Sequence, residues 1–178
     1  MGQSTTFYRI SSDSFKQLKE SDNRDDRSIF ALNKGYIILQ GTNDAIEFLL
    51  SKDVDDSSLL LVREIFYPSR SLGDPKYSNQ DPEDQMKFYK SGGFIRYLDS
   101  ETVLLTNELL SKFPESYFRE QYNSKELNTN GIYPEVWHDA NSNDLAFNED
   151  HLIIEVMQLK FIFDEAAKLN DYVLILSG

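Results

Sequence analysis

The hydrophobic pattern of this chain predicts both helices and strands. The clearest helix is expected over residues 148–168, where apolar side chains recur every three or four positions along one face. Acids in its first turn and Lys168 in its last turn complement the helix dipole. After the turn signal Asn170-Asp171, residues 172–176 are apolar without interruption. A strand of this kind is usually covered on both faces, so we expect it near the centre of a sheet.

Shorter patterns predict the other elements. The remaining predicted strands share aromatic and β-branched residues: 6–10, 36–39 and 94–98. The remaining predicted helices begin at residues that suit a helix start: Ser12 or Ser14, Thr42 or Asn43, Ser100, and Pro114. Polar residues predict loops over 20–28 and 67–85, whereas 59–66 is apolar and predicts a strand or the end of a helix. We therefore predict an α+β fold with helices packed on a mixed sheet.

The length and charge of the chain narrow the classes of function. With 178 residues and 40% hydrophobic content, a single compact domain over residues 1–178 is expected. The chain carries 18 basic and 30 acidic residues, for a net charge of −12. Such a field disfavours binding to nucleic acids and anionic membranes, and it favours a basic protein partner. The plainer interpretation is that the acids serve solubility, since charge does not report on fold.

The absence of cysteine removes another group of functions. Disulfides, thiol catalysis and thiolate metal sites are excluded, because the sequence contains no cysteine. We see no secretory signal and no apolar run near the length of about 20 residues that a membrane-spanning helix needs. These observations fit a reducing compartment, and we expect a cytoplasmic protein without cofactor.

Four segments in order carry a resemblance to a known family. They are the strand Phe7–Ile10 after Met1-Gly2, the helical stretch Asp44–Leu50, the strand Phe94–Leu98, and Ile132–Trp137. Together they resemble the YfbM-like family of small bacterial proteins, a domain of unknown function. The resemblance extends over nearly the whole chain and implies a compact α+β fold. It implies no known activity, cofactor or catalytic residue.

Three places depart from that family pattern. Asn43 stands where the family usually has tryptophan, and Glu47 stands where it commonly has histidine. Gly93-Phe94-Ile95 stands where the family commonly has a Gly-Pro-Ala approach. If that tryptophan and histidine serve a ligand site in the family, the site is altered or absent here.

The stretch Gly131–Trp137 contains the only tryptophan of the chain. Pro134 stiffens it, so Tyr133 and Trp137 are either anchors of an interface or residues that pack the sheet against the last helix. Arg96 and Tyr97 are candidates to join this cluster in space, with Arg96 binding an anion or neutralising Glu135. These five residues are our candidate binding site.

A calcium loop is the only metal site with recognisable spacing. The oxygen-bearing residues Asp139, Asn141, Asn143 and Asp150 occupy the first, third, fifth and twelfth positions of an EF-hand loop. However, the sixth position needs glycine and holds Asp144. The alternative is a loop of Asx turns that caps the next helix, and we predict no metal site.

The two histidines offer only a weak catalytic signal. His138 and His151 lack zinc spacing and have no serine or cysteine nucleophile signature beside them, although either could act as a base near neutral pH.

These observations leave two functional hypotheses. The leading one is a non-enzymatic, acidic protein-binding module, for example an immunity-type neutraliser of a basic toxin or effector. The alternative is a small-molecule-binding protein or enzyme with a pocket around Arg96, Tyr133, Glu135 and Trp137. The sequence leaves the oligomeric state and the identity of any partner open.

Overall fold

The structure of the chain is a computed structural model that describes residues 4–21, 24–73, 82–83, 85–86, 94–140 and 145–177. The described helices are α1 (Ser12–Glu20), α2 (Asp26–Leu32), α3 (Asn43–Leu50), α4 (Asp56–Phe66), α6 (Ser100–Ser111), α7 (Glu115–Gln121), α8 (Ser124–Thr129) and α9 (Glu149–Leu169). The described strands are β1 (Thr5–Ile10), β2 (Asn33–Leu39), β3 (Ser71–Leu72), β4 (Ile95–Leu98) and β5 (Tyr172–Ser177). The α+β class is thereby confirmed.

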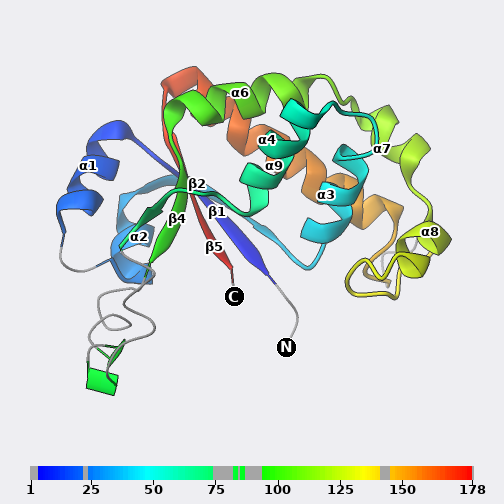
Figure 1. Cartoon of the computed structure of the whole chain (residues 1–178), viewed down its shortest axis with the longest axis horizontal. Helices are drawn as coiled ribbons and strands as arrows, with labels where there is room; N and C mark the ends of the chain where they lie inside the picture. Colours follow the sequence, from blue (N-terminus) through cyan, green and yellow to red (C-terminus); the bar gives the residue numbers. More distant parts are fainter. Residues whose placement is uncertain are drawn as a thin grey trace.

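The strands form one five-stranded sheet in the order β2-β1-β5-β4-β3 (Figure 1). The C-terminal strand β5 is the middle strand, as its unbroken apolar run predicted. All four pairings between the described strands are antiparallel, so the prediction of a mixed sheet is wrong. The hydrophobic pattern reports which faces of a strand are buried, but it does not encode the direction of the neighbouring strands.

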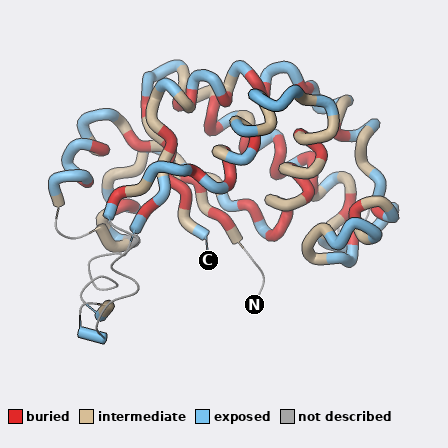
Figure 2. Tube along the Cα trace, viewed as in Figure 1, coloured by how far each residue is buried: buried red, intermediate tan, exposed pale blue. Residues whose placement is uncertain are grey.

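Helices cover both faces of the sheet. Figure 1 shows α1 and α2 on the left of the sheet, and the other six described helices on its right. The larger apolar core lies on the side of α9, where Phe7 of β1 contacts Phe66 of α4 and Phe163 of α9 edge-on, each with ring centroids 6.3 Å apart. The smaller core lies under α1 and α2, where Phe15 stacks on Tyr172 of β5 at 4.0 Å. Figure 2 shows the buried residues gathered between these layers.

Two local expectations need correction, and a third is settled between its alternatives. A helix, α2, begins inside the polar segment 20–28, because the Asp25 carboxylate caps it by accepting the Ser28 N–H at 2.8 Å. Segment 59–66 ends helix α4, so the helical one of its two predicted alternatives is confirmed, and its buried residues fall at helical spacing. The cap of α6 is Asp99, one residue before the predicted Ser100. The N-caps of α2 and α6 are aspartates, Asp25 and Asp99, and the sequence pattern alone did not identify them as caps.

The long α9 was predicted closely, and its end also matches the sequence. Asn170 adopts the left-handed conformation with φ 56°, and its N–H is accepted by the last turn of the helix. The chain then reverses into β5, where buried Asp171 pairs with Arg9 of β1 at 3.6 Å. None of the helices in the described ranges combines the length and the apolar character needed to cross a bilayer.

Candidate functional site

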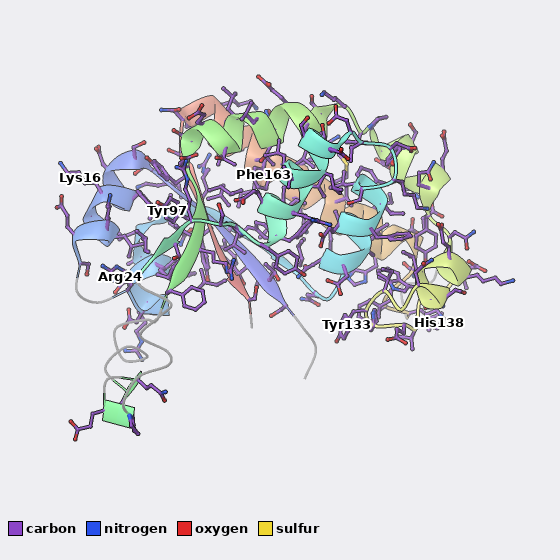
Figure 3. All side chains as sticks on the ribbon, in the orientation of Figure 1. Lys16, Arg24, Tyr97, Tyr133, His138 and Phe163 are labelled. Carbon is purple, nitrogen blue, oxygen red and sulfur yellow. The ribbon has the colours of Figure 1, made fainter. Side chains whose placement is uncertain are left out.

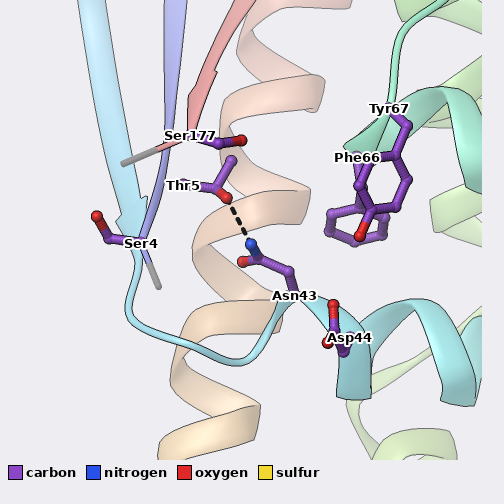
Figure 4. Close-up of a pocket in the computed structure, with 7 residues that line it drawn as sticks. All are labelled: Ser4, Thr5, Asn43, Asp44, Phe66, Tyr67 and Ser177. Carbon is purple, nitrogen blue, oxygen red and sulfur yellow. Dashed lines mark hydrogen bonds between the residues drawn. The ribbon is translucent and has the colours of Figure 1, made fainter. Parts of the chain in front are cut away.

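A cleft of about 270 Å³ opens where the ends of β1 and β5 meet the start of α3 (Figure 4). It is lined by hydroxyl groups, an amide, a carboxylate and two aromatic rings: Ser4, Thr5, Asn43, Asp44, Phe66, Tyr67 and Ser177. We call it the strand-end cleft. Antiparallel pairing places Thr5 of β1 opposite Ser177 of β5, and the end of α4 brings Phe66 and Tyr67 to the other side.

The start of α3 faces this cleft without the usual side-chain cap. Thr42 occupies the N-cap position, but its hydroxyl donates to the Glu155 carboxylate of α9 instead of accepting from the helix. Asn43 donates from Nδ2 to the Thr5 hydroxyl, as Figure 4 shows. The buried Oδ1 of Asn43 has no hydrogen-bond partner among the described residues. The start of α3 therefore offers the cleft one acceptor, Asn43 Oδ1, and backbone N–H donors that no side chain caps.

The charges around the strand-end cleft are mainly negative. Burial and then the neighbouring Asp44 carboxylate raise the pKa of Glu47, while Arg63 lowers it. Burial, the charges of Asp44 and Glu47, and a hydrogen bond to Asp44 raise the pKa of Tyr67. The phenol thus stays protonated beside two carboxyl groups. Carboxylates next to aromatic rings suit a cationic group, such as an ammonium or guanidinium.

Trp137, the most prominent residue of the sequence, is buried with 3% of its surface exposed. Its indole N–H donates to the carbonyls of Ile132 and Tyr133 at 3.1 and 3.2 Å. Asn128 holds its backbone by donating to its carbonyl and accepting its N–H. The ring lies edge-on to Phe147 at a centroid distance of 5.7 Å. Of the two alternatives for Trp137, the structure shows packing and not an exposed interface anchor.

The structure does not bring Arg96 together with Tyr133, Glu135 and Trp137, because β4 and the segment after α8 lie at different ends of the molecule (Figure 1). Arg96 is on β4, where its guanidinium donates to the Pro68 carbonyl at 2.7 Å. Tyr97 packs with the rings of the smaller core, whereas Tyr133 lies at the opposite end of the molecule (Figure 3).

Only part of the predicted cluster therefore comes together. Tyr133, Glu135 and Trp137 share the segment after α8, whose Tyr133–Pro134 peptide bond is cis. Glu135 is exposed there. Strand pairing holds Arg96 and Tyr97 in the sheet, far from that segment. The local sequence pattern could not predict this separation, because it does not report how far apart two segments lie in the folded chain.

The calcium candidate loses two of its ligands to protein partners. The Asp139 carboxylate accepts from the Ser124 hydroxyl at 2.5 Å, and Asp150 accepts from Arg119 at 3.2 Å. Asn141 and Asn143 lie outside the described residues, so the complete loop is untested. Among residues 4–140 and 145–177, as far as they are described, no three potential ligands are grouped for a metal ion.

The histidines also have structural partners. The exposed His138 forms an isolated bridge with Asn148 and connects the Trp137 segment to the start of α9. His151 accepts the Phe147 N–H at Nδ1 at 3.0 Å, which places its proton on Nε2, 3.1 Å from the Glu155 carboxylate. His151 is thus part of a buried polar network and not a free base at the strand-end cleft.

Gly41 holds the loop between β2 and α3 against the aromatic segment. Its φ of +83° is unfavourable for other residues, and an added Cβ would lie 2.9 Å from Tyr133 Cε1 and 3.2 Å from Phe147 Cε1. We expect Gly41→Ala to lower the free energy of unfolding by about 2–4 kcal/mol, from backbone strain and overpacking combined. Urea denaturation measures this loss.

Gly131→Ala is the matched control for that substitution. Gly131 also has a positive φ, +67°, but a Cβ there meets no heavy atom within 4 Å. Its loss should be limited to the strain of about 1–2 kcal/mol. Equal losses at the two positions would contradict a role for the contact between Gly41 and Tyr133.

Sequence reasoning missed the strand-end cleft itself. One signal pointed toward it, because two of the three departures from the family pattern lie here. Asn43 lines the cleft, and Glu47 interacts electrostatically with Asp44 and Tyr67 beside it. Phe66, Tyr67 and Ser177 had no signal in the sequence, since the folding of β5 and α4 brings them there.

Comparisons with known proteins agree with this architecture. The crystal structure of YfbM from Escherichia coli, a protein of unknown function, matches with a TM-score of 0.58 and 19% sequence identity, over 100% of both chains. At that identity the likeness concerns the fold alone. No curated protein matches the chain. The profile of the family described as "Domain of unknown function (DUF1877)" matches residues 1–176, and the chain belongs to this family.

Proposed function

We propose that this protein is a non-enzymatic binding module that recognises a basic protein in the cytoplasm. The observation that carries the proposal is the strand-end cleft, where Asp44 and the nearby Glu47 lie beside the rings of Phe66 and Tyr67. A lysine or arginine side chain of a partner fits such a site, because it meets negative charge and aromatic surface together. The net charge of −12 supports the encounter over a longer range.

An immunity-type neutraliser is one form of this function. In that form the module would cover the basic surface of a toxin or effector, and the strand-end cleft would hold one inserted cation. Hydrogen bonds to a charged group contribute about 1.5–3 kcal/mol each, so a single inserted side chain suffices as an anchor.

The test is affinity capture from native lysate at low and moderate salt, followed by mass spectrometry. We expect the wild-type protein to retain a basic protein in stoichiometric amount and to release it as salt increases. Asp44→Asn should weaken binding of the captured partner by roughly ten- to hundredfold. Glu120→Gln, which removes an exposed acid from α7, is the control and should bind as the wild type does. Equal binding by both variants would contradict the role of the cleft.

A second candidate is the binding of a small cationic molecule in the same cleft. Its volume of about 270 Å³ favours this alternative, because it is near the lower end of small-ligand pockets. Thermal shift with a series of amines and amino acids would separate the two candidates. Stabilisation by a small amine, with an empty capture from lysate, would favour the small molecule.

The pH dependence of binding should follow Glu47. Its pKa is raised above 4.5, so the carboxyl is neutral over a wider range than usual and attracts a cation only after losing its proton. Affinity for a lysine-rich peptide should therefore rise as pH increases from 4.5 through the raised pKa. Titration calorimetry at several pH values measures this rise. In Glu47→Gln the rise should shrink, and an unchanged profile in that variant would assign the dependence to another group.

A further inference from the structure

The outer strand β2 presents a row of exposed residues without acids. Among the described strands it pairs with β1 alone. Tyr36 and Ile38 are 50% and 40% exposed, although they lie on a strand whose alternate residue Ile37 packs against the larger core. The other exposed positions of the row are Lys34 and Gln40. An edge strand of this kind has free backbone groups and apolar side chains beside them.

Helix α9 lies on the opposite face of the sheet from Tyr36 and Ile38, which share the face of α2, where Tyr36 contacts Phe30, and α9 reaches the same sheet edge. Ile154, Met157 and Phe161 are 57%, 40% and 64% exposed, and their spacing of three and four residues puts them on one face of the helix. Phe161 lines a hollow of about 180 Å³ together with Tyr36 and Ile37 of β2. The exposed stripe of α9 and the edge of β2 thus meet at Phe161, and together they form what we call the β2–α9 surface.

The charge of the β2–α9 surface distinguishes between possible partners. The exposed row of β2 and the residues Ile154, Met157 and Phe161 carry one charge, that of Lys34, whereas the chain as a whole carries 30 acids. One turn beyond Phe161, the half-exposed Asp164 is neutralised by Lys168 at 2.6 Å. Glu165 lines the same hollow, but it pairs with Arg9 at 3.4 Å. A basic partner finds no free carboxylate in the exposed row and stripe. A second copy of this chain, which is strongly acidic elsewhere, approaches with the least repulsion here.

We infer that the chain forms a symmetric homodimer through the β2–α9 surface, with β2 paired antiparallel to β2 of the second copy. An antiparallel strand can pair with itself about a two-fold axis, so the same surface serves both copies. With the axis near Ile37, Tyr36 of one copy lies beside Ile38 of the other, an aromatic and β-branched pair that stabilises sheets. The α9 stripes then face each other above the extended sheet. This surface shares no residue with the strand-end cleft, so the dimer is independent of the proposed binding function.

The test is the mass of the full chain by sedimentation equilibrium across a concentration series. We expect a dimer for the wild type and at least a tenfold weaker association for Phe161→Glu and for Ile38→Lys. Leu60→Glu is the matched control, because Leu60 on α4 is 65% exposed, as Phe161 is 64% exposed, and it lies outside the surface. It introduces the same charge and should leave the dimer intact. Circular dichroism verifies that each variant is folded.

Two results would overturn the inference. One is a wild-type protein that stays monomeric at every concentration. The other is a dimer that Leu60→Glu weakens as much as Phe161→Glu does, because association would then depend on total charge alone. The dependence on salt concentration distinguishes the dimer from binding at the cleft. The dimer should persist or strengthen as salt screens the repulsion between acidic copies, whereas binding of a basic protein should weaken.

Discussion

Glu155→Ala should lower the free energy of unfolding by about 3–5 kcal/mol, because it removes the acceptor of several donors and each buried group left unsatisfied costs about 1–3 kcal/mol. The Glu155 carboxylate is almost fully buried on α9. It accepts the Gln40 N–H at 2.9 and 3.0 Å, the hydroxyl of Thr42, and the Nε2–H of His151 at 3.1 Å. Loss of this residue therefore detaches the end of β2 and the start of α3 from α9.

Urea denaturation of Glu155→Ala, Glu155→Gln and Glu120→Ala tests this prediction. Glutamine keeps one acceptor oxygen but turns an NH₂ group toward the same donors, so its loss should be smaller than that of alanine. Glu120 is exposed on α7, and its replacement should change stability by no more than about 0.5 kcal/mol. A loss below about 1 kcal/mol for Glu155→Ala would mean that water satisfies the donors and that the network is not essential.

Trp137→Ala should cost a similar amount, about 3–5 kcal/mol, because the substitution removes a large buried ring and leaves a cavity. The ring contacts Tyr122 and Phe147, with centroids 6.3 and 5.7 Å away, and its N–H is shared by two backbone carbonyls. It thereby connects the segment after α8 to the start of α9. Removing the ring should weaken the packing of the segment after α8 against Phe147 and the start of α9.

Thermal and urea denaturation of Trp137→Ala, Trp137→Phe and Val136→Ala measure the effect. Phenylalanine keeps most of the apolar contact but leaves the two carbonyls without the indole donor, so its loss should be intermediate. Val136 is the neighbouring residue and is 52% exposed, so it controls for the change of sequence in this segment. A small loss for Trp137→Ala would indicate that the segment is held mainly by the hydrogen bonds of Asn128 to the Trp137 backbone.

The separation of Arg96 from Tyr133, Glu135 and Trp137 has a definite physical origin. The candidate residues were joined because they are polar or aromatic and resemble family segments, but side chains meet only where strand pairing and helix packing place them. Arg96 was fixed by its position between β5 and β3, and Trp137 by the closing of the α8–α9 connection against α9. Conversely, Glu155 lies within the apolar stripe of α9, and its position gave no sign that Gln40 and Thr42, in the loop between β2 and α3, would donate to its carboxylate.

The strand-end cleft illustrates the same limit at the level of function. Its residues come from the first strand, the start of α3, the end of α4 and the last strand. Only the antiparallel alignment of Thr5 with Ser177 brings the two ends of the described chain to one place. Local sequence patterns do not connect these residues, because their proximity depends on contacts between segments far apart in sequence.

The sequence by itself determined the α+β class, the long α9, the central β5 and the turn between them, because these depend on periodic hydrophobic burial and local capping. It also determined the family, through segments in a characteristic order. Only the tertiary structure decided the antiparallel sheet, the buried Glu155 network, the strand-end cleft and the exposed β2–α9 surface. These features depend on which distant segments pack together, and that choice is made by the energy of the whole fold and not by any single stretch of the chain.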